Sequence, residues 1–340
     1  MTTAPLRLAL DRAALQDNWR LLARMAGTAC GAAVKADGYG LGALGVARAL
    51  AEAGCRDFFV ATWAEAIALV PLALPVSVLH GVRDADLPLA RALDFARPVL
   101  NTPAQIARWR ASGGGACDVM VDTGMNRLGL APAELAQAAD LPIETLMSHL
   151  ARADEDVGEN EAQRGAFAAL AGAVPARRRS LANSAGIALG TGYAFDLVRP
   201  GLALYGGVPR AELAAIRPVA QPEAAIVQRR ELPAGAAIGY NALYVAAQDM
   251  PVGIVHLGYA DGYPRALENK GVARWRGAAL PVIGRVSMDL IALDLRVAPE
   301  LGEGDWVSFD FDLPALAAAS GRAQYELLTG LGARFDRVWG

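Results

Sequence analysis

Apolar and polar positions alternate along the first two thirds of the chain in a pattern that predicts repeated strand–helix units. Short apolar runs are separated by alanine-rich stretches with helical periodicity, among them 63–69, 102–112 and 160–174. The predicted strands cover 31–35, 57–61, 76–80, 96–100, 117–122, 144–149, 179–182 and 198–205. This repetition favours an α/β fold, a (β/α)₈ TIM-type barrel, in which functional residues gather at the C-terminal ends of the strands.

The pattern changes after about residue 218. Short alternating strands over 224–233, 253–260, 280–296 and 305–310 are interrupted by proline and glycine, and a helical stretch and a final strand follow. This predicts a small, mostly antiparallel β domain. We therefore expect a barrel domain over 1–218 and a C-terminal β domain over 219–340.

Composition favours a globular protein that acts on a small molecule. Of 340 residues, 54% are hydrophobic and 20% are charged, and the formal net charge is −3, so no surface for nucleic acid is expected. The N-terminal segment lacks the long apolar run of a signal peptide or membrane span, from which we expect a cytoplasmic protein without membrane contact. Three scattered cysteines and three histidines far apart in the sequence predict no metal site.

Lys35 is the first candidate for chemistry, because a lysine that ends a buried strand is costly unless its amine is used. Gly40, Gly42 and Gly45 formally match the G-x-G-x-x-G pattern of dinucleotide-binding enzymes. The match is poor, because residues 35–39 separate the strand end from the first of these glycines. The alternative is that Lys35 carries an aldehyde cofactor as a Schiff base, with Tyr39 packing beside it.

Polar residues at the ends of other predicted strands indicate the same rim of the barrel. Arg127 follows the fifth strand, His149 ends the sixth, Asn183 and Ser184 follow the seventh, and Arg199, Gly201 and Leu202 accompany the eighth. Each residue alone is compatible with a surface ion pair, a helix cap or a satisfied core side chain. Their joint occurrence at the C-terminal strand ends predicts a functional site.

Eight motifs follow one another along the chain: KADGYG, VDTGMNRLG, SHLARADE, NSAG, VRPGLALYG, GYNALY, HLGYADGYPR and VIGRVSMD. This ordered series, from about Leu8 to Trp339, resembles the alanine racemase family of pyridoxal phosphate enzymes. The resemblance implies pyridoxal 5'-phosphate as the cofactor and the interconversion of L-alanine and D-alanine, which can supply D-alanine for the cell wall. It also implies a homodimer with shared active sites.

The resemblance assigns two catalytic residues to opposite faces of the substrate. Lys35 would hold the cofactor and act as a base on one face, which requires its pKa to fall below the usual value of about 10.4. Tyr240, from the β domain of the other subunit, would exchange the proton on the opposite face. Two groups are needed because racemisation removes a proton from one face and delivers one to the other.

The resemblance also implies the contacts of the cofactor. Arg199 would face the pyridine nitrogen and, because arginine stays protonated, would leave that nitrogen without a proton. Phosphate contacts map onto Tyr39, Ser184 and the backbone amides of Gly201 and Leu202. His149 and Asn183 belong to the same cofactor-binding set.

Substrate contacts are implied at three positions. Arg127 would lie near the phenolic oxygen of the cofactor and the substrate carboxylate. Met288 of the second subunit would offer its backbone amide to that carboxylate, and Tyr259 would narrow the entrance.

Several positions depart from the commonest family pattern. Met120 stands where many relatives carry a lysine whose carbamate steadies the arginine of this loop, so what positions Arg127 stays open. Asp37 and Leu41 replace an asparagine and a histidine often found there, and Ala333 stands where some members use a phosphate-binding tyrosine.

Other functions remain compatible with parts of the sequence. A broader racemase could also accept serine, and a pyridoxal phosphate decarboxylase of the same architecture would need a catalytic cysteine late in the chain, where none follows Cys117. A cofactor-carrying barrel protein without activity would not need the β domain. Whether the reaction serves biosynthesis or catabolism is left open by the sequence.

Overall fold

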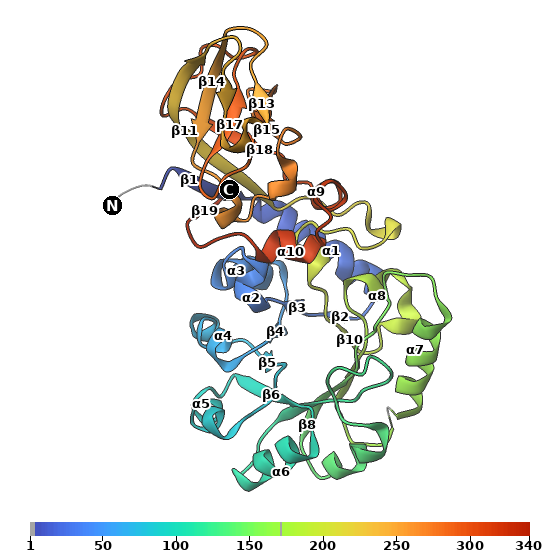
Figure 1. Ribbon diagram of the computed structural model, residues 1–340. Helices are drawn as coiled ribbons and strands as arrows, with labels where there is room; N and C mark the ends of the chain where they lie inside the picture. Colours follow the sequence, from blue (N-terminus) through green and yellow to red (C-terminus); the bar gives the residue numbers. More distant parts are fainter. Residues whose placement is uncertain (1–3, 171) are drawn as a thin grey trace. The chain divides into compact units, whose positions relative to one another are not determined.

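The structure, a computed structural model, describes residues 4–170 and 172–340 (Figure 1). Residues 1–3, at the start of the predicted barrel domain, and residue 171, in the predicted helix over 160–174, lie outside the described part. The chain divides into two compact units. One unit spans Leu15–Arg217, and the other combines the N-terminal segment that ends at Ala14 with Pro218–Gly340.

The unit Leu15–Arg217 is a barrel of parallel strands. Its strands are β2 (Ala29–Cys30), β3 (Ala32–Ala33), β4 (Phe58–Val60), β5 (Val76–Val78), β6 (Ala96–Leu100), β7 (Cys117–Met120), β8 (Ile143–Met147), β9 (Arg178–Ser180) and β10 (Leu197–Val198). Strands β3 to β9 pair in chain order, and β10 pairs with β2, which continues into β3 across Gly31.

Backbone hydrogen bonds close the ring of strands. The Gly31 amide donates to Val198 O at the β2–β10 seam, and the Arg199 amide donates to Ala182 O at the end of β9. With β2 and β3 counted as one strand, these bonds complete the predicted (β/α)₈ barrel, which is therefore confirmed. The predicted strand over 198–205 is wrong in its second half, because Leu202–Tyr205 forms a 3₁₀ turn.

Helices follow the strands around the barrel (Figure 1). They are α1 (Arg12–Ala26), α2 (Lys35–Tyr39), α3 (Ala43–Ala53), α4 (Trp63–Ile67), α5 (Leu87–Ala92), α6 (Pro103–Ala111), α7 (Gly158–Leu170) and α8 (Ser184–Ala188). The local sequence fixes several of their starts. Thr102 caps α6 by accepting from the Gln105 amide, and Pro103 follows at the first helical position, where no amide hydrogen is needed.

The second unit is a mostly antiparallel β structure with two short helices. Its elements are β1 (Leu6–Leu10), β11 (Ala220–Leu232), β12 (Ala237–Ile238), β13 (Tyr244–Val245), β14 (Met250–Val255), β15 (Val272–Trp275), β16 (Ala278–Ile283), β17 (Ile291–Asp294), β18 (Trp306–Phe309), α9 (Leu313–Ser320), α10 (Gln324–Thr329) and β19 (Asp336–Trp339). The large sheet runs β14-β17-β16-β15-β18-β11-β1-β19, and β14 also pairs with the long strand β11.

The N-terminal strand corrects the expected domain boundary. Strand β1 pairs antiparallel with β11 and parallel with β19, so it is part of the β unit. Leu6, Leu8 and Leu10 are buried and alternate with partly exposed residues, which is the pattern of a strand with one covered face. The expected boundary of 1–218 therefore differs from the division found here, in which the barrel unit begins at Leu15.

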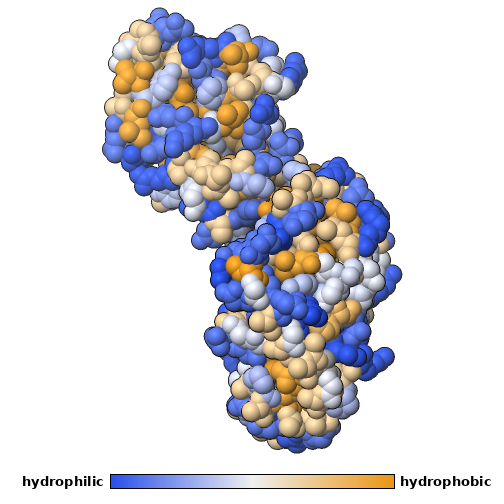
Figure 2. Space-filling model, turned by 90° about the vertical axis from the view of Figure 1, so that its right-hand side faces the viewer, coloured by the Kyte–Doolittle hydropathy of each residue, from blue (hydrophilic) through white to orange (hydrophobic). Residues whose placement is uncertain are grey.

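The described helices of both units include no candidate membrane span. Within the residues that the structure describes, no helix is long and apolar enough to cross a bilayer. In the view of Figure 2, hydrophobic side chains form scattered orange patches among hydrophilic ones.

Candidate active site

Lys35 stands where a barrel strand turns into an unusual loop. It begins α2 directly after β3, and the following residues have left-handed backbone angles: Ala36 (φ 52), Asp37 (φ 52), Gly38 (φ 63) and Tyr39 (φ 55). Such a conformation costs roughly 1 kcal/mol or more for each residue other than glycine, and strain of this kind is typical of functional sites. The chain has only one other lysine, Lys270, which is exposed in the β unit.

Hydrogen bonds from side chains hold this left-handed turn. Glu65, near the start of α4, accepts from the Ala36 amide at 2.8 Å, and its other oxygen accepts from the Ala61 amide at 2.6 Å. Asp37 accepts from the Ala43 amide at 2.8 Å and so anchors the turn to α3. The backbone that follows Lys35 is therefore held by contacts with two separate segments, α4 and α3.

The environment of Lys35 favours a neutral amine. Burial lowers the pKa of Lys35, the Arg127 and Arg199 charges lower this pKa further, and Glu65 opposes them in part. Burial, followed by the charges of Arg199, Arg127 and Lys35, lowers the pKa of His149 to about 3. His149 is therefore neutral near pH 7, and the rim concentrates positive charge without a nearby histidinium.

Arg199 is buried and held from two neighbouring strand ends. Its guanidinium donates to Ser180 Oγ, at the end of β9, and to Ser148 O, after β8, at 2.6 Å. Its Cζ lies 5.9 Å from the centre of the Phe59 ring. Burial lowers the pKa of Arg199 to about 10, so the guanidinium still carries its charge at neutral pH.

Ser184, Gly201 and Leu202 meet beside Tyr39. Ser184 Oγ accepts from the Gly201 amide at 3.0 Å and from the Ala203 amide at 3.1 Å. The Leu202 amide between them makes no hydrogen bond within 4–170 and 172–340, although its side chain is buried. A buried amide without a partner indicates a place for an acceptor from outside the chain.

The Tyr39 hydroxyl lies so close to Gly201 that no side chain could be placed at position 201. A Cβ atom on Gly201 would lie 2.2 Å from the Tyr39 hydroxyl. The Tyr39 ring stacks on Tyr205 with centroids 4.6 Å apart, and the Tyr205 hydroxyl donates to Ala33 O at 2.8 Å. Asn183 lies next to this group and caps α8 through the Gly186 amide at 2.8 Å.

Arg127 lies on an exposed loop that is ordered by one aspartate. Asp122 Oδ1 accepts from the amides of Gly124, Met125 and Asn126 at 2.9, 2.9 and 3.1 Å. Met120 is buried and makes no polar contact with Arg127 in the part of the chain that the structure describes. Asp122, five residues before Arg127, thus fixes the backbone of this loop without a modified lysine.

Tyr240, Tyr259 and Met288 form a second group, on the β unit. All three side chains are exposed, Tyr240 at 69% of its surface. The Tyr259 and Ala260 amides donate to Ser287 O and Met288 O, each at 3.0 Å, so the loops of Tyr259 and Met288 lie side by side. The structure therefore gathers the predicted site residues into two sets, one on each unit.

Residues that the sequence did not single out support the barrel set. They are Glu65, Ser148, Ser180, Phe59 and Tyr205. Glu65 could have been found, because Thr62 and Glu65 have the spacing of a capping box, which the structure contains. The serines carry no local signal, since their role depends on contacts between neighbouring strands.

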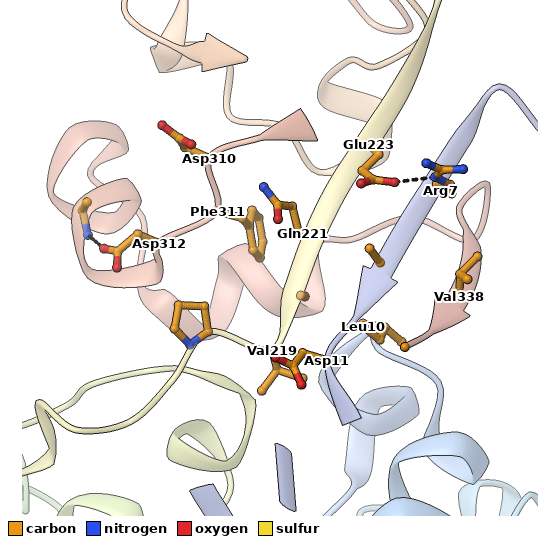
Figure 3. Close-up of a pocket in the computed structure, with 15 residues that line it drawn as sticks. Arg7, Leu10, Asp11, Val219, Gln221, Glu223, Asp310, Phe311, Asp312 and Val338 are labelled. Carbon is orange, nitrogen blue, oxygen red and sulfur yellow. Dashed lines mark hydrogen bonds and ion pairs between the residues drawn. The ribbon is translucent and has the colours of Figure 1, made fainter. Parts of the chain in front are cut away.

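A cavity of about 850 Å³ lies within the β unit and contains none of the predicted site residues (Figure 3). Its charged side chains already have partners: Arg7 pairs with Glu223, Asp310 pairs with Arg274, Asp11 accepts from the Ala14 amide, and Asp312 caps α9. Among the described residues, no group of three His, Cys, Asp or Glu could hold a metal ion. This cavity is therefore separate from the predicted site residues at the barrel rim.

The barrel unit combines a lysine of lowered pKa, a buried arginine and a cluster of hydroxyl and amide groups, and this combination defines a class of protein. It is the class of (β/α)₈ enzymes in which a lysine holds a phosphate-bearing cofactor. Family models described as the N-terminal and C-terminal domains of alanine racemase match residues 10–209 and 219–339. The chain belongs to the alanine racemase family.

Individual relatives agree with this assignment over nearly the full length. The chain is 43% identical over 350 residues to an alanine racemase of Acidiphilium cryptum, covering 97% of this chain and 98% of the relative. It is 42% identical over 355 residues to a catabolic alanine racemase of Agrobacterium fabrum, covering 98% and 91%. A crystal structure of alanine racemase from Bartonella henselae with covalently bound pyridoxal phosphate has a TM-score of 0.85 and 33% identity, covering 99% and 100%.

Proposed function

We propose that this protein is an alanine racemase, which interconverts L-alanine and D-alanine with pyridoxal 5'-phosphate as its cofactor. The observation that carries the proposal is the position of Lys35. One of two lysines in the chain, it follows a barrel strand directly, is held by a strained turn, and has a pKa lowered by burial and two arginines. Family membership over both domains supports the same activity.

The residues present fit the cofactor. A phosphate needs hydroxyl and amide donors without a carboxylate among them, and Tyr39, Ser184 and the unpaired Leu202 amide meet this need. Because Gly201 has no Cβ atom, the space beside it is open to the Tyr39 hydroxyl. Arg199 offers a fixed positive charge for the ring nitrogen, and Asn183 and His149 complete the surroundings.

When bound, the cofactor withdraws electrons from the substrate Cα and makes its proton acidic. Lys35, as a neutral amine, accepts that proton at Nζ on one face. The Tyr240 hydroxyl of a second copy donates a proton to the other face, because a single base would return the proton to the side from which it came. Arg199 keeps the ring nitrogen unprotonated, which limits competing reactions and suits an enzyme that returns the proton in each cycle.

The substrate carboxylate is held by Arg127 and by the Met288 amide of the second copy, and Tyr259 narrows the entrance. These roles require a homodimer in which each β unit completes the site of the other copy. The exposure of Tyr240, Tyr259 and Met288 supports this, because large exposed side chains on one unit are typical of an interface. We place the enzyme in the cytoplasm, where it can supply D-alanine to the cell wall.

Borohydride reduction followed by peptide mass spectrometry tests the proposal. The pyridoxyl group is expected on the peptide of Lys35, and Lys270 serves as the internal control. A chiral assay should then show both enantiomers of alanine forming from either one, and serine can be compared under the same conditions. A label on Lys270 alone, or no turnover of alanine by the loaded protein, would contradict the proposal.

A further inference from the structure

We propose that Arg334 is a positioning residue that fixes the substrate-binding loops of the β unit. The inference rests on the function proposed above, in which Met288 donates its amide to the substrate carboxylate and Tyr259 borders the entrance. Arg334 touches neither the substrate nor the cofactor in this scheme. Its role is to hold the two loops in one arrangement.

Arg334 joins the two loops directly through two carboxylates. Its Nε lies 2.7 Å from Asp261 Oδ1, and one terminal nitrogen lies 2.7 Å from Asp289 Oδ1. Asp261 ends the 3₁₀ turn Tyr259–Asp261, and Asp289 follows Met288 in the chain. One guanidinium therefore binds a carboxylate two residues after Tyr259 and another directly after Met288.

The loops are also bonded to each other, so a change at one is transmitted to the other. The Ala260 amide donates to Met288 O at 3.0 Å, and Asp261 Oδ2 accepts from the Gly258 amide at 3.0 Å. A Cβ atom on Gly258 would lie 2.1 Å from Met288 O, which shows how closely the backbones approach. The Met288 amide belongs to the same peptide group as the Ser287 carbonyl, which accepts from the Tyr259 amide at 3.0 Å. The Tyr259 loop therefore holds the peptide groups on both sides of Met288.

The Met288 amide remains available for an acceptor. Ser287 and Leu290, before and after Met288 in the chain, form hydrogen bonds with each other. Within the described residues the Met288 amide has no hydrogen-bond partner. This agrees with donation to a substrate carboxylate. The direction of this amide depends on the loop that Arg334 holds.

The choice of arginine is chemically informative. Two carboxylates on different loops need a planar group with donors that point in two directions, which a lysine ammonium does not provide in fixed geometry. Asp261 is fully buried, so without Arg334 its charge would lose its main counterion. The loops would then relax, and the substrate carboxylate would be bound less well.

The test compares Arg334→Gln with Arg296→Gln in the loaded full-length enzyme. Arg296 is the matched control, because its side chain is 46% exposed against 41% for Arg334, and it also pairs with a buried aspartate, Asp294, away from these loops. For Arg334→Gln we expect the KM for alanine to rise by about tenfold, the effect of one weakened charge-assisted hydrogen bond, with a smaller change in kcat. Arg296→Gln should leave both values close to those of the unmodified enzyme.

Two further readouts separate positioning from general damage. Propionate, which is alanine without its amine, should inhibit Arg334→Gln more weakly by a similar factor, while absorbance of the lysine-bound cofactor stays unchanged. Asp289→Asn changes the exposed carboxylate beside Met288 and leaves the contact between Arg334 and Asp261 in place. It should therefore raise the KM for alanine by less than Arg334→Gln does. Because both changes act on one contact, the double variant should be no worse than Arg334→Gln.

The outcomes distinguish this inference from the proposed function. If the unmodified enzyme does not racemise alanine, the proposed function fails. If it does, but Arg334→Gln and Asp289→Asn both match Arg296→Gln in KM and in propionate inhibition, the positioning role of Arg334 is overturned. A loss of kcat at constant KM would also overturn it, because Met288 acts here by binding the carboxylate.

Discussion

Replacing Gly201 by alanine should damage the cofactor site through a single contact. The new Cβ atom would lie 2.2 Å from the Tyr39 hydroxyl and 2.8 Å from the ring carbon that bears it. Ordinary contact between such atoms is about 3.4 Å, so the hydroxyl must move by roughly 1 Å. The ring cannot move freely, because it stacks on Tyr205 and its backbone has φ of 55°.

General magnitudes for such contacts give the expected size of two effects, on stability and on cofactor binding. Overpacking of a buried ring costs about 1–3 kcal/mol, which is the expected loss in the free energy of unfolding. Displacing one donor from a bound phosphate costs about 1.5–3 kcal/mol, so the Kd of pyridoxal phosphate should rise roughly 10- to 100-fold. Urea unfolding of the cofactor-free protein and a fluorescence titration with the cofactor measure the two quantities.

Two controls make this prediction specific. Gly165, in α7, has no atom within 4 Å of a Cβ, so Gly165→Ala should be neutral or stabilise the fold by up to about 1 kcal/mol. In a Tyr39→Phe background the closest contact is removed, and Gly201→Ala should then destabilise less. The same stability and cofactor affinity in Gly201→Ala as in the unmodified protein would refute the reasoning.

Two further predictions concern pH and the strained turn. Burial and neighbouring cations lower the pKa of His149 to about 3 in the folded protein, whereas its pKa in the unfolded chain is about 6.5. Between these two pH values only the unfolded state binds a proton at this residue. The cofactor-free protein should therefore lose about 2 kcal/mol more stability than His149→Gln between pH 7.5 and pH 5, and equal losses in urea unfolding would contradict this. Glu65→Gln should cost about 1–2 kcal/mol, because Glu65 accepts from the Ala36 amide with one oxygen and from the Ala61 and Thr62 amides with the other, and glutamine has only one acceptor oxygen. Glu134 uses a single oxygen, which glutamine can replace, so Glu134→Gln should cost less.

Local patterns in the sequence predict the barrel because its strands are short apolar runs between helical segments. They fail where pairing is non-local or where turns interrupt an apolar run. Strand β1 is stabilised by partners more than 200 residues away, at Ala220–Leu232 and Asp336–Trp339, and no local feature indicates which unit it joins. The run Leu202–Tyr205 has the composition of a strand, but Pro200 and Gly201 before it and Gly206 after it make it a 3₁₀ turn.

The candidate site, like the fold, could be predicted from the sequence only in part. Motif order places Lys35, Ser184 and Arg199 at strand ends. In the structure Ser184 accepts from the Gly201 amide, two residues after Arg199, and the charge of Arg199 lowers the pKa of Lys35. The left-handed turn after Lys35 could not be predicted, because its residues are ordinary apart from one glycine and the conformation depends on Glu65, which lies on another βα unit. The order of the Arg127 loop likewise depends on Asp122, which lies in the motif VDTGMNRLG but carries no role that the motif alone would indicate.

The central claim is that two different groups exchange the α-proton on opposite faces of alanine, Lys35 on one and Tyr240 of the second copy on the other. Tyr240→Phe in deuterated water, with each enantiomer supplied separately, measures it most directly. We expect the cofactor to remain reducible onto Lys35, racemisation to fall by about 100-fold or more, and deuterium to enter alanine efficiently from one enantiomer only. Racemisation at the rate of the unmodified enzyme, with deuterium entering equally from both enantiomers, would contradict the account.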